Sequence, residues 1–342
     1  MKKAILISIT IASIILLFGY YNLMHRDNTN FEGDSTFIYI NSSDSIVSIL
    51  DTISKKIKSP KTFLKAAKRM DYIENIKSGR FNILKGAGNK EIINSLKFNN
   101  TPLTVTFNNQ ERIHDLAGRV SKQILADSVS LLNAFLEKSF LEDNGFNETN
   151  SMSIYIPNSY EFFWNVEPNK FRNRMLEEYN DFWNEDRTKK AKSIDLSKKE
   201  VIVLASIVQK ESIKLDERPI IAGVYLNRLR KKMRLQADPT VIYSIKSYYN
   251  NFDTIIRRVL YRDLKLESPY NTYKIKGLPP GPISMPDISS IDAVLNSRSH
   301  DYIFFVADPY NPGYHLFAST LRQHNKNRRV YTRWLNSKKI YR

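Results

Sequence analysis

The N-terminus carries the longest apolar run of the chain. Residues 4–21 contain no charged side chain, and Lys2 and Lys3 precede them. Such a run is about long enough to cross the hydrocarbon core of a bilayer, and Tyr20 and Tyr21 suit its interface. We expect an uncleaved single-pass anchor, because no small-residue cleavage pattern follows; a signal peptide is the alternative. The two lysines favour a cytoplasmic N-terminus, with the rest of the chain on the extracytoplasmic side of the cell (inner) membrane.

Beyond the anchor, apolar residues recur in short strand patterns, each followed by a turn and a helix. Strands are expected at 37–40 and 79–84, and the helices that follow them at 46–50 and 90–96. A further helix is expected between them, at 60–72. Strand, capped turn and helix fit half of a LysM-like unit, so we expect a small LysM-like αβ subdomain.

The rest of the chain mixes helices with a few strands. The pattern predicts a strand at 103–107, a largely helical stretch at 112–141, a polar linker at 143–153, a charged helix at 168–192, and a hairpin with strands at 301–308 and 315–318. The expected fold class is therefore α+β. The expected domains are 1–26 (stub and transmembrane helix), 27–150 (LysM-like subdomain and helical connector) and 151–342 (a larger mixed α+β domain).

One glutamate stands out on an otherwise apolar helix. A capping box at 197–200 begins a helix over 201–212, and a stripe that includes Leu204 and Val208 leads at helical spacing to Glu211. Desolvation on a core-facing stripe disfavours the charged carboxylate and raises its pKa. A general acid needs such a pKa near neutral pH, so Glu211 is a candidate catalytic residue.

A structural alternative is that Glu211 forms an ion pair with Arg218 or Arg228 at the helix end. The segments that follow favour a site, because they are polar, aromatic and stiffened by proline. They lie at 217–219, 235–243, 268–273 and 277–283. Such segments make a poor core and a plausible sugar-binding groove, since proline lowers the entropy cost of holding a binding loop.

Net charge and composition limit the classes of binding partner. The 342-residue chain has a net charge of +17 and a pI near 9.7, which attracts nucleic acid, anionic lipid or acidic wall polymers. The basic residues are dispersed without a nucleic-acid recognition motif, so we expect no nucleic acid as a partner. The absence of cysteine excludes a disulfide framework.

These motifs together closely resemble the endolytic murein transglycosylases, the MltG or YceG-like family, from about Tyr155 to the C-terminus. The family pattern around its catalytic glutamate is similar to A-S-I-V-E-K-E, and residues 205–211 read A-S-I-V-Q-K-E. The resemblance assigns the catalytic glutamate to Glu211. The departure is Gln209, about 160° from Glu211 around the helix, so we expect that a carboxylate there is not needed for the chemistry.

The resemblance implies a function. It implies a lyase that cleaves the β-1,4 bond between N-acetylmuramic acid and N-acetylglucosamine within nascent peptidoglycan strands, leaves 1,6-anhydro ends and terminates glycan elongation. Residues 151–342 would be its catalytic domain, residues 4–21 would contact the lipid bilayer, and penicillin-binding synthases would be partners. The alternative is a non-catalytic peptidoglycan-binding membrane anchor.

The predicted site combines Glu211 with polar residues of the matching motifs. The expected substrate-binding residues are Glu217, Arg218, Asn227, Gln236, Asp238, Tyr270, Asn271, Tyr273 and His315. Glu217 also has a structural interpretation as an ion-pair partner of Arg218, and Asp238 one as a turn residue before Pro239. His315, His324 and Asp308 match no standard zinc spacing, so we expect neither a metal nor a cofactor.

Overall fold

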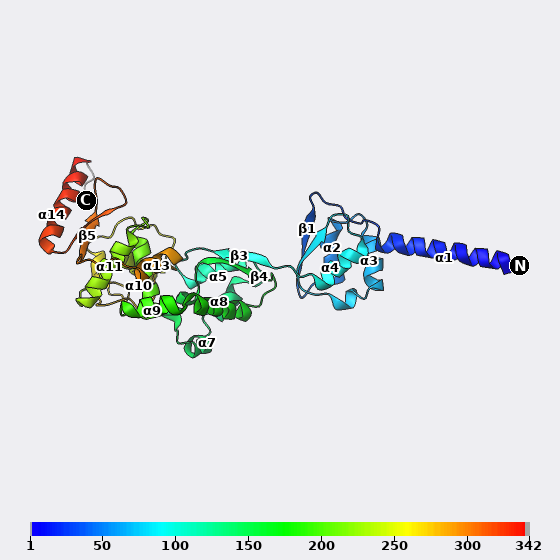
Figure 1. The fold of residues 1–342 in the computed structure, drawn as a ribbon, viewed down its shortest axis with the longest axis horizontal. Coiled ribbons are helices and arrows are strands. Elements are labelled where there is room, and N and C mark those ends of the chain that lie inside the picture. The colour runs from blue at the N-terminus through cyan, green and yellow to red at the C-terminus, as the bar shows by residue number, and fades with distance from the viewer. Residues whose placement is uncertain (1, 339–342) are drawn as a thin grey trace. The chain divides into compact units, whose positions relative to one another are not determined.

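The computed structural model describes residues 2–338, which divide into two compact units. Unit 1 comprises the chain up to Val105 with Ser121–Ala126 and Tyr160–Glu167, and unit 2 comprises Thr106–Val120, Asp127–Ser159 and the chain from Pro168 onward. The predicted α+β class is confirmed. Figure 1 labels most of the helices of both units and several of their strands.

Unit 1 is built on a two-stranded antiparallel sheet with helices packed against it. Its elements are α1 (Lys2–Met24), β1 (Ser35–Ile40), α2 (Ile46–Ser54), α3 (Pro60–Arg69), the 3-10 turn η1 (Ile73–Asn75), β2 (Gly79–Leu84) and α4 (Asn89–Phe98). Strand β1 pairs with β2 from Ser35 opposite Leu84 to Ile40 opposite Gly79. The alternate residues Ile38 and Ile40 face a core that also holds Phe63 of α3.

The strands and helices predicted for unit 1 are present, but two helices differ in length. The helix expected at 46–50 continues to Ser54. The helix expected at 60–72 ends at Arg69, because Asp71 adopts a left-handed backbone with φ +50° and Tyr72 turns into the core. The LysM-like assignment of this unit stays a prediction.

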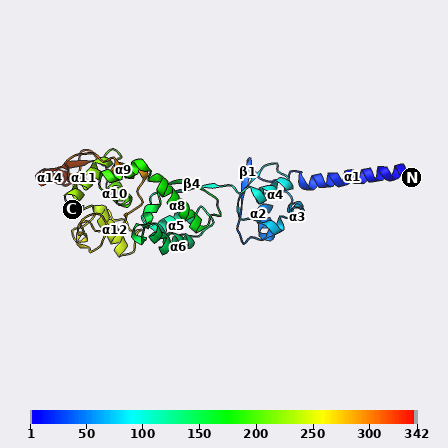
Figure 2. The same cartoon turned by 60° about the horizontal axis from the view of Figure 1, so that its bottom comes forward.

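Helix α1 projects from the core of unit 1 as one continuous helix, as Figure 1 and Figure 2 show. Its apolar side chains are largely exposed, with Leu16 at 74% and Phe18 at 67% of full exposure. Only the end of the helix is built into the unit, where Met24 is buried. By length and composition α1 can cross a membrane.

Strands β3 (Leu103–Phe107) and β4 (Asn158–Phe162) form a second two-stranded sheet, and the boundary between the units falls within both strands. The elements of unit 2 are α5 (Ile113–Ser121), α6 (Ser128–Phe135), α7 (Lys138–Asp143), η2 (Glu148–Ile154), α8 (Pro168–Phe182), α9 (Glu185–Ser193), α10 (Lys198–Glu211), α11 (Arg218–Arg230), α12 (Asp238–Tyr248), η3 (Asp263–Lys265), α13 (Ile288–Leu295), β5 (Phe304–Ala307), β6 (His315–Ala318) and α14 (Leu321–Ser337).

Helix α10 forms the centre of unit 2. Its capping box is present, since the Ser197 side chain accepts from the Glu200 amide and the Glu200 carboxylate accepts from the Ser197 amide. Every residue from Val201 to Val208 is buried, so the helix is surrounded by protein rather than buried along a stripe. Helices α9, α11, α12 and α13 pack around it.

Three sequence predictions for unit 2 differ from the structure in detail. The charged helix expected at 168–192 is broken into α8 and α9, because Trp183 is buried and the Asn184 side chain caps the second helix. The segment expected as a polar linker at 143–153 contains η2, whose residues from Ser151 to Ile154 are buried. The strand expected at 301–308 is confirmed only over Phe304–Ala307, and its partner at 315–318 is confirmed.

Candidate active site

Glu211 is the last residue of α10 and lies where the helix emerges from its buried surroundings. Ser212 follows as the C-cap, and its amide donates to the Val208 carbonyl. The negative end of a helix dipole disfavours an added negative charge at this position. The site therefore begins with a carboxyl group that the backbone itself biases toward its protonated form.

The surroundings of Glu211 raise its pKa to about 7. Desolvation is the largest cause, and the nearby charge of Asp238 raises the pKa further. Three groups act in the opposite direction: the hydrogen bond from Tyr225 and the charges of His315 and Arg228. The sum leaves a carboxyl group that can both donate and accept a proton near neutral pH.

Tyr225 orients the carboxyl group. Its hydroxyl donates to Glu211 Oε1 at 2.6 Å, and the tyrosine is 1% exposed on α11. Burial and the neighbouring Glu211 raise the pKa of Tyr225 well above its usual value, so the phenol remains a donor. Because Tyr225 binds Oε1, Oε2 is the oxygen left for a reacting group.

A cleft of about 210 Å³ opens beside Glu211. It is lined by α10, α11, the segment before α12, and both strands of the C-terminal hairpin. The lining residues are Glu211, Tyr225, Arg228, Leu235, Gln236, Asp238, Tyr273, Phe305, Val306, Ala307 and His315. Polar groups from separate segments thus converge on one carboxyl group in a partly apolar cleft.

The ion-pair interpretation of Glu211 is wrong. The Arg218 guanidinium binds Asp287 at 3.1 Å and the Ser212 carbonyl at 3.0 Å. Arg228 is buried and donates to the backbone carbonyls of Leu235 and Ile303, each at 2.6 Å. These contacts make both arginines structural links between α11 and its neighbours.

Glu217 holds His315 at the cleft. Its buried carboxylate accepts from the Ser212 hydroxyl at 3.1 Å, the His315 amide at 2.7 Å and His315 Nδ1 at 2.8 Å. An ionised carboxylate only accepts, so this contact assigns the ring proton to Nδ1 and leaves Nε2 as the second polar atom. The predicted pair of Glu217 with Arg218 is wrong, because Glu217 links α11 to β6 instead.

The opposite wall of the cleft is fixed by a buried polar cluster. Tyr273 donates its hydroxyl to Asp238 Oδ1 at 2.7 Å. Fully buried Thr272 binds Thr240 at 2.8 Å and accepts from the Ala237 amide at 3.0 Å, which ties the Tyr273 loop to the start of α12. Gln236, which immediately precedes Ala237, adopts a left-handed backbone with φ +51°. This conformation costs an L-residue conformational free energy, and it clusters at binding sites.

Comparison with known proteins identifies the family. The family model described as the YceG-like family matches residues 38–330. The chain belongs to the YceG-like family.

Individual relatives agree with this assignment. The chain is 41% identical over 138 residues to an endolytic murein transglycosylase of Bacillus subtilis, an alignment that covers 40% of this chain and 36% of the relative. It is 35% identical over 136 residues to an endolytic murein transglycosylase of Streptococcus pneumoniae, covering 40% of this chain and 24% of the relative. These alignments therefore span well under half the length of either relative.

A solved structure shares the fold. The crystal structure of a yceG-like protein from Listeria monocytogenes superimposes with a TM-score of 0.55 and 26% identity, covering 86% of this chain and 98% of that one. The similarity therefore extends beyond the aligned segments of the curated relatives.

The structure brings together only part of the predicted site of this YceG-like chain. Gln236, Asp238, Tyr273 and His315 line the cleft with Glu211. The remaining predicted substrate-binding residues lie outside that lining, and their side chains bind or pack against other protein groups. They are Glu217, Arg218, Asn227, Tyr270 and Asn271.

Asn271 and Asn227 illustrate the difference. Asn271 is fully buried, its amide nitrogen donates to the Leu266 carbonyl at 2.7 Å, and its oxygen accepts from the Tyr273 amide at 3.0 Å. Asn227 donates to the His300 and Tyr302 carbonyls at 2.6 and 3.0 Å. Both side chains are therefore bound to protein groups and neither lines the cleft, so their contact with a sugar stays a prediction.

Sequence reasoning missed Tyr225 as the group that binds Glu211. A signal was present, since Tyr225 and Arg228 are three residues apart on one helix and therefore share a face. Gly223 on the same helix also has a packing role. A Cβ there would lie 2.6 Å from the Arg298 carbonyl oxygen, so glycine allows the chain to cross α11 closely on its way to β5.

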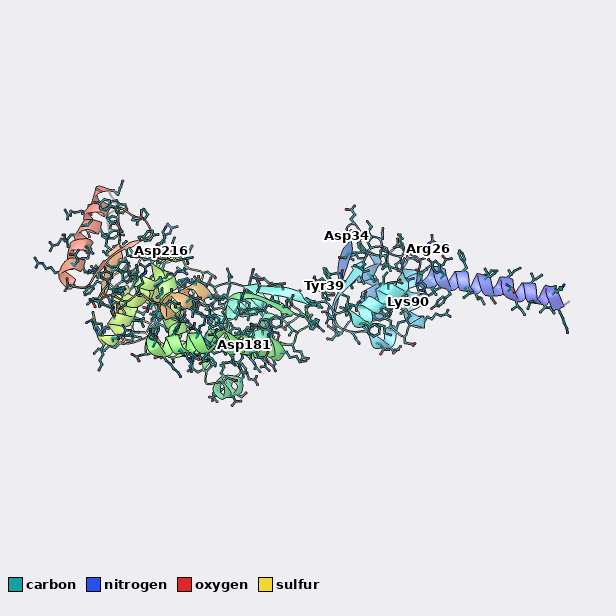
Figure 3. The ribbon with its side chains drawn as sticks, viewed as in Figure 1. Arg26, Asp34, Tyr39, Lys90, Asp181 and Asp216 are labelled. Atoms are coloured by element: carbon teal, nitrogen blue, oxygen red, sulfur yellow. The ribbon has the colours of Figure 1, made fainter. Side chains whose placement is uncertain are left out.

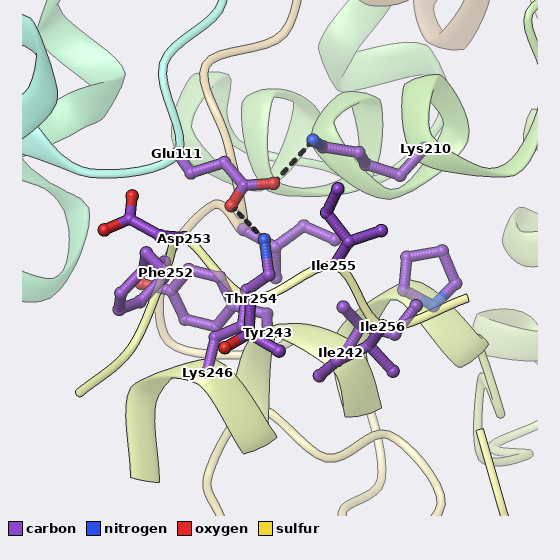
Figure 4. A pocket seen from close by; sticks show the side chains of 12 residues that line it. Glu111, Lys210, Ile242, Tyr243, Lys246, Phe252, Asp253, Thr254, Ile255 and Ile256 are labelled. Carbon is purple, nitrogen blue, oxygen red and sulfur yellow. Dashed lines mark hydrogen bonds and ion pairs between the residues drawn. The ribbon is translucent and has the colours of Figure 1, made fainter. Parts of the chain in front are cut away.

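A second cleft of about 300 Å³ lies beside α10 and α12 (Figure 4). Glu111 is its central charge, and its two carboxylate oxygens bind Lys210 at 2.9 Å and Lys246 at 2.7 Å. Burial alone would raise the pKa of Glu111, but the hydrogen bonds from the two lysines outweigh it and hold the pKa below its usual value. We interpret Glu111 as a structural residue that joins α10 to α12 through its two ion pairs.

Within residues 2–338, no group of three or more His, Cys, Asp and Glu side chains is arranged to hold a metal ion. His324 stacks on Phe304 with ring centroids 5.0 Å apart, whereas His315 binds Glu217.

Proposed function

We propose that this chain is an endolytic lytic transglycosylase that cleaves peptidoglycan with Glu211 as its single general acid and base. The observation that carries the proposal is a carboxyl group with a pKa of about 7 inside a cleft lined by aromatic and polar residues. The names of the relatives from Bacillus subtilis and Streptococcus pneumoniae support the same activity.

In the proposed reaction, protonated Glu211 gives its proton from Oε2 to the glycosidic oxygen of N-acetylglucosamine. The bond from that oxygen to C1 of N-acetylmuramic acid breaks, and positive charge develops at C1. The C6 hydroxyl of the same muramic acid then loses its proton to the Glu211 carboxylate, and its oxygen bonds to C1. The products are a 1,6-anhydro end and a free C4 hydroxyl, and no water is consumed.

Intramolecular attack explains why one carboxylate suffices. A hydroxyl on the same sugar has a high effective molarity, so the protein does not have to position an external nucleophile. Tyr225 holds Oε1, which restricts the carboxyl group to one orientation during both proton transfers. Gln236 and His315 are in a position to bind the acetamido or hydroxyl groups of the sugars.

Asp238 supports one rival mechanism. It is a second carboxylate in the cleft, and hydrolases commonly use two carboxylates, one of them to activate water or attack C1. Its hydrogen bond from Tyr273 instead suits a role in shaping the cleft and in raising the pKa of Glu211. A non-catalytic peptidoglycan-binding anchor is the other alternative.

The cellular context follows from the same proposal. Helix α1 would anchor the chain in the cell membrane, with the cleft on the extracytoplasmic side. Unit 1 would act as a LysM-like glycan-binding module. Cleavage within nascent strands would end their elongation, and penicillin-binding synthases would be neighbours.

The decisive experiment digests uncrosslinked glycan strands with the full-length protein in water enriched in heavy oxygen. We expect anhydro-muramic ends without label, formed by the wild type and lost in Glu211→Gln. Glu200→Gln, which changes the same charge at the opposite end of α10, serves as the matched control and should retain activity. Labelled reducing ends would indicate a hydrolase, and unchanged strands would indicate a binding protein.

A further inference from the structure

Unit 1 contains a basic cleft at the base of α1. The cleft has a volume of about 500 Å³ and lies between the last two turns of α1 and the beginning of α3. Figure 3 labels Arg26, one of its lining residues, where α1 ends. No step of the proposed reaction uses this cleft.

Hydrogen bonds join the residues that line this cleft to the end of the apolar helix α1. Asn89, 1% exposed, donates to the Leu23 carbonyl at 2.7 Å, and Asn28 donates to Asn89 Oδ1 at 2.7 Å. These bonds join the end of α1 to the folded part of unit 1. If α1 spans a bilayer, Tyr20 and Tyr21 lie near its interface, and the cleft lies at the level of the lipid head groups.

The charge of the cleft is positive and only partly compensated. Lys58 pairs with Asp27 at 2.5 Å, and this hydrogen bond is the largest cause of the lowering of the pKa of Asp27 to about 2. Arg26 and Lys65 also line the cleft, and among residues 2–338 the structure gives neither of them a carboxylate partner. Two cationic side chains are therefore available to an anion.

The cleft also has room beside the helix. A Cβ at Gly19 would meet no atom within 4 Å, so glycine leaves this part of the lining open. The amide of Asn22 adds a polar group one turn farther along α1. An arginine, a lysine and an amide next to an open apolar helix surface suit a group that is anionic at one end and apolar at the other.

We propose that this cleft binds the phosphodiester head group of an anionic phospholipid, and that Arg26 and Lys65 contact the phosphate. The proposal rests on the proposed membrane insertion of α1. The bound lipid would fix the height and rotation of unit 1 against the bilayer surface.

The test inserts the full-length chain into phosphatidylcholine nanodiscs that contain a minor fraction of phosphatidylglycerol and counts retained lipids by native mass spectrometry. We expect selective retention of phosphatidylglycerol, weakened roughly 30-fold when Arg26 and Lys65 are both changed to Gln, since each basic residue near a membrane contributes about 1 kcal/mol. Lys61→Gln with Lys68→Gln is the matched control, because it removes the same charge from exposed positions of α3 outside the lining.

The remaining outcomes separate the explanations. Equal loss in both double variants would indicate diffuse attraction and overturn the site, as would equal retention of the two lipids by the wild type. Displacement of the lipid by millimolar inorganic phosphate would assign the site to a free anion. Resistance of α1 to alkaline extraction is measured in parallel: failed insertion overturns the membrane proposal, whereas insertion without lipid selectivity overturns only the lipid site. Thermal unfolding shows that the variants remain folded.

Discussion

At the scale of single residues, the site depends on how opposing effects are balanced on Glu211. Burial, the end of α10 and Asp238 favour the protonated carboxyl group, whereas Tyr225 favours the carboxylate. The balance places the pKa at about 7, within reach of both proton transfers. Tyr225 and Asp238 can each be substituted singly, and the two substitutions should shift the pKa of Glu211 in opposite directions.

Tyr225→Phe and Asp238→Asn should shift the pH dependence of cleavage in opposite directions. The acid must be protonated at the start of the cycle, so the rate falls as pH rises through the pKa of Glu211. Loss of the Tyr225 hydrogen bond raises this pKa and moves the falling limb to higher pH, whereas loss of the Asp238 charge moves it to lower pH. Rate profiles of the wild type and both variants test this; shifts in the same direction would contradict the assignment.

Glu211→Gln should stabilise the folded protein at alkaline pH. A pKa raised from 4.5 to about 7 means that folding favours the protonated form. The resulting stability is fully present below pH 4.5 and is lost as pH rises through about 7. Above that pH the carboxylate costs about 3 kcal/mol, which glutamine removes. Thermal unfolding at pH 8 and pH 4 measures it: a higher midpoint for the variant only at pH 8 is expected, and equal differences at both would refute it.

At the scale of elements, helix packing rather than local pattern decides which polar side chains meet. The capping box and apolar run predicted α10 correctly, and the spacing of Glu211 indicated a desolvated carboxyl group. The sequence does not show that α11 crosses α10 so that Tyr225 meets Glu211, because this contact depends on tertiary packing. For the same reason Asn271 looked like a sugar ligand although the fold uses it to hold a loop.

Gln209 shows how the packing explains a departure from the family pattern. Its Oε1 accepts from the Asp287 amide at 2.6 Å, at the start of α13. A glutamate in this position could accept the same hydrogen bond. Glutamine at this position is therefore compatible with the packing of α10 against the start of α13. That the chemistry needs no carboxylate there stays a prediction.

Glu111→Gln should loosen the contact between α10 and α12. Lys246, whose side chain is 12% exposed, would lose its carboxylate partner, at a cost of about 1–3 kcal/mol. Because the pKa of Glu111 is lowered, its contribution is present above the usual carboxyl pKa and is lost as pH falls through the lowered value. Denaturant unfolding at neutral and acidic pH measures it.

The matched control for Glu111 is Glu185→Gln, which breaks the exposed pair of Glu185 with Lys189. An exposed pair contributes at most about 1 kcal/mol, so the control should change little. Equal changes in the free energy of unfolding for the two substitutions would contradict the proposed role of Glu111 in joining α10 to α12.

At the scale of the whole molecule, the chain joins an apolar helix, a small αβ unit and a larger unit with the cleft. The sequence predicted the apolar helix α1 and most strands correctly, because these depend on local hydrophobic patterns. It did not predict the division of β3 and β4 between the units, since that depends on contacts between distant segments. The cleft at the base of α1 depends in the same way on α3, whose pattern alone indicates only a basic amphipathic helix.

The central claim is that Glu211 remains protonated up to about neutral pH. An infrared titration of the carboxyl bands, taken as the difference between the full-length wild type and Glu211→Gln, measures it directly. The account predicts one carboxyl group that is present only in the wild type and titrates near pH 7. A difference signal that titrates at about pH 4.5, the ordinary value, would contradict the proposed mechanism.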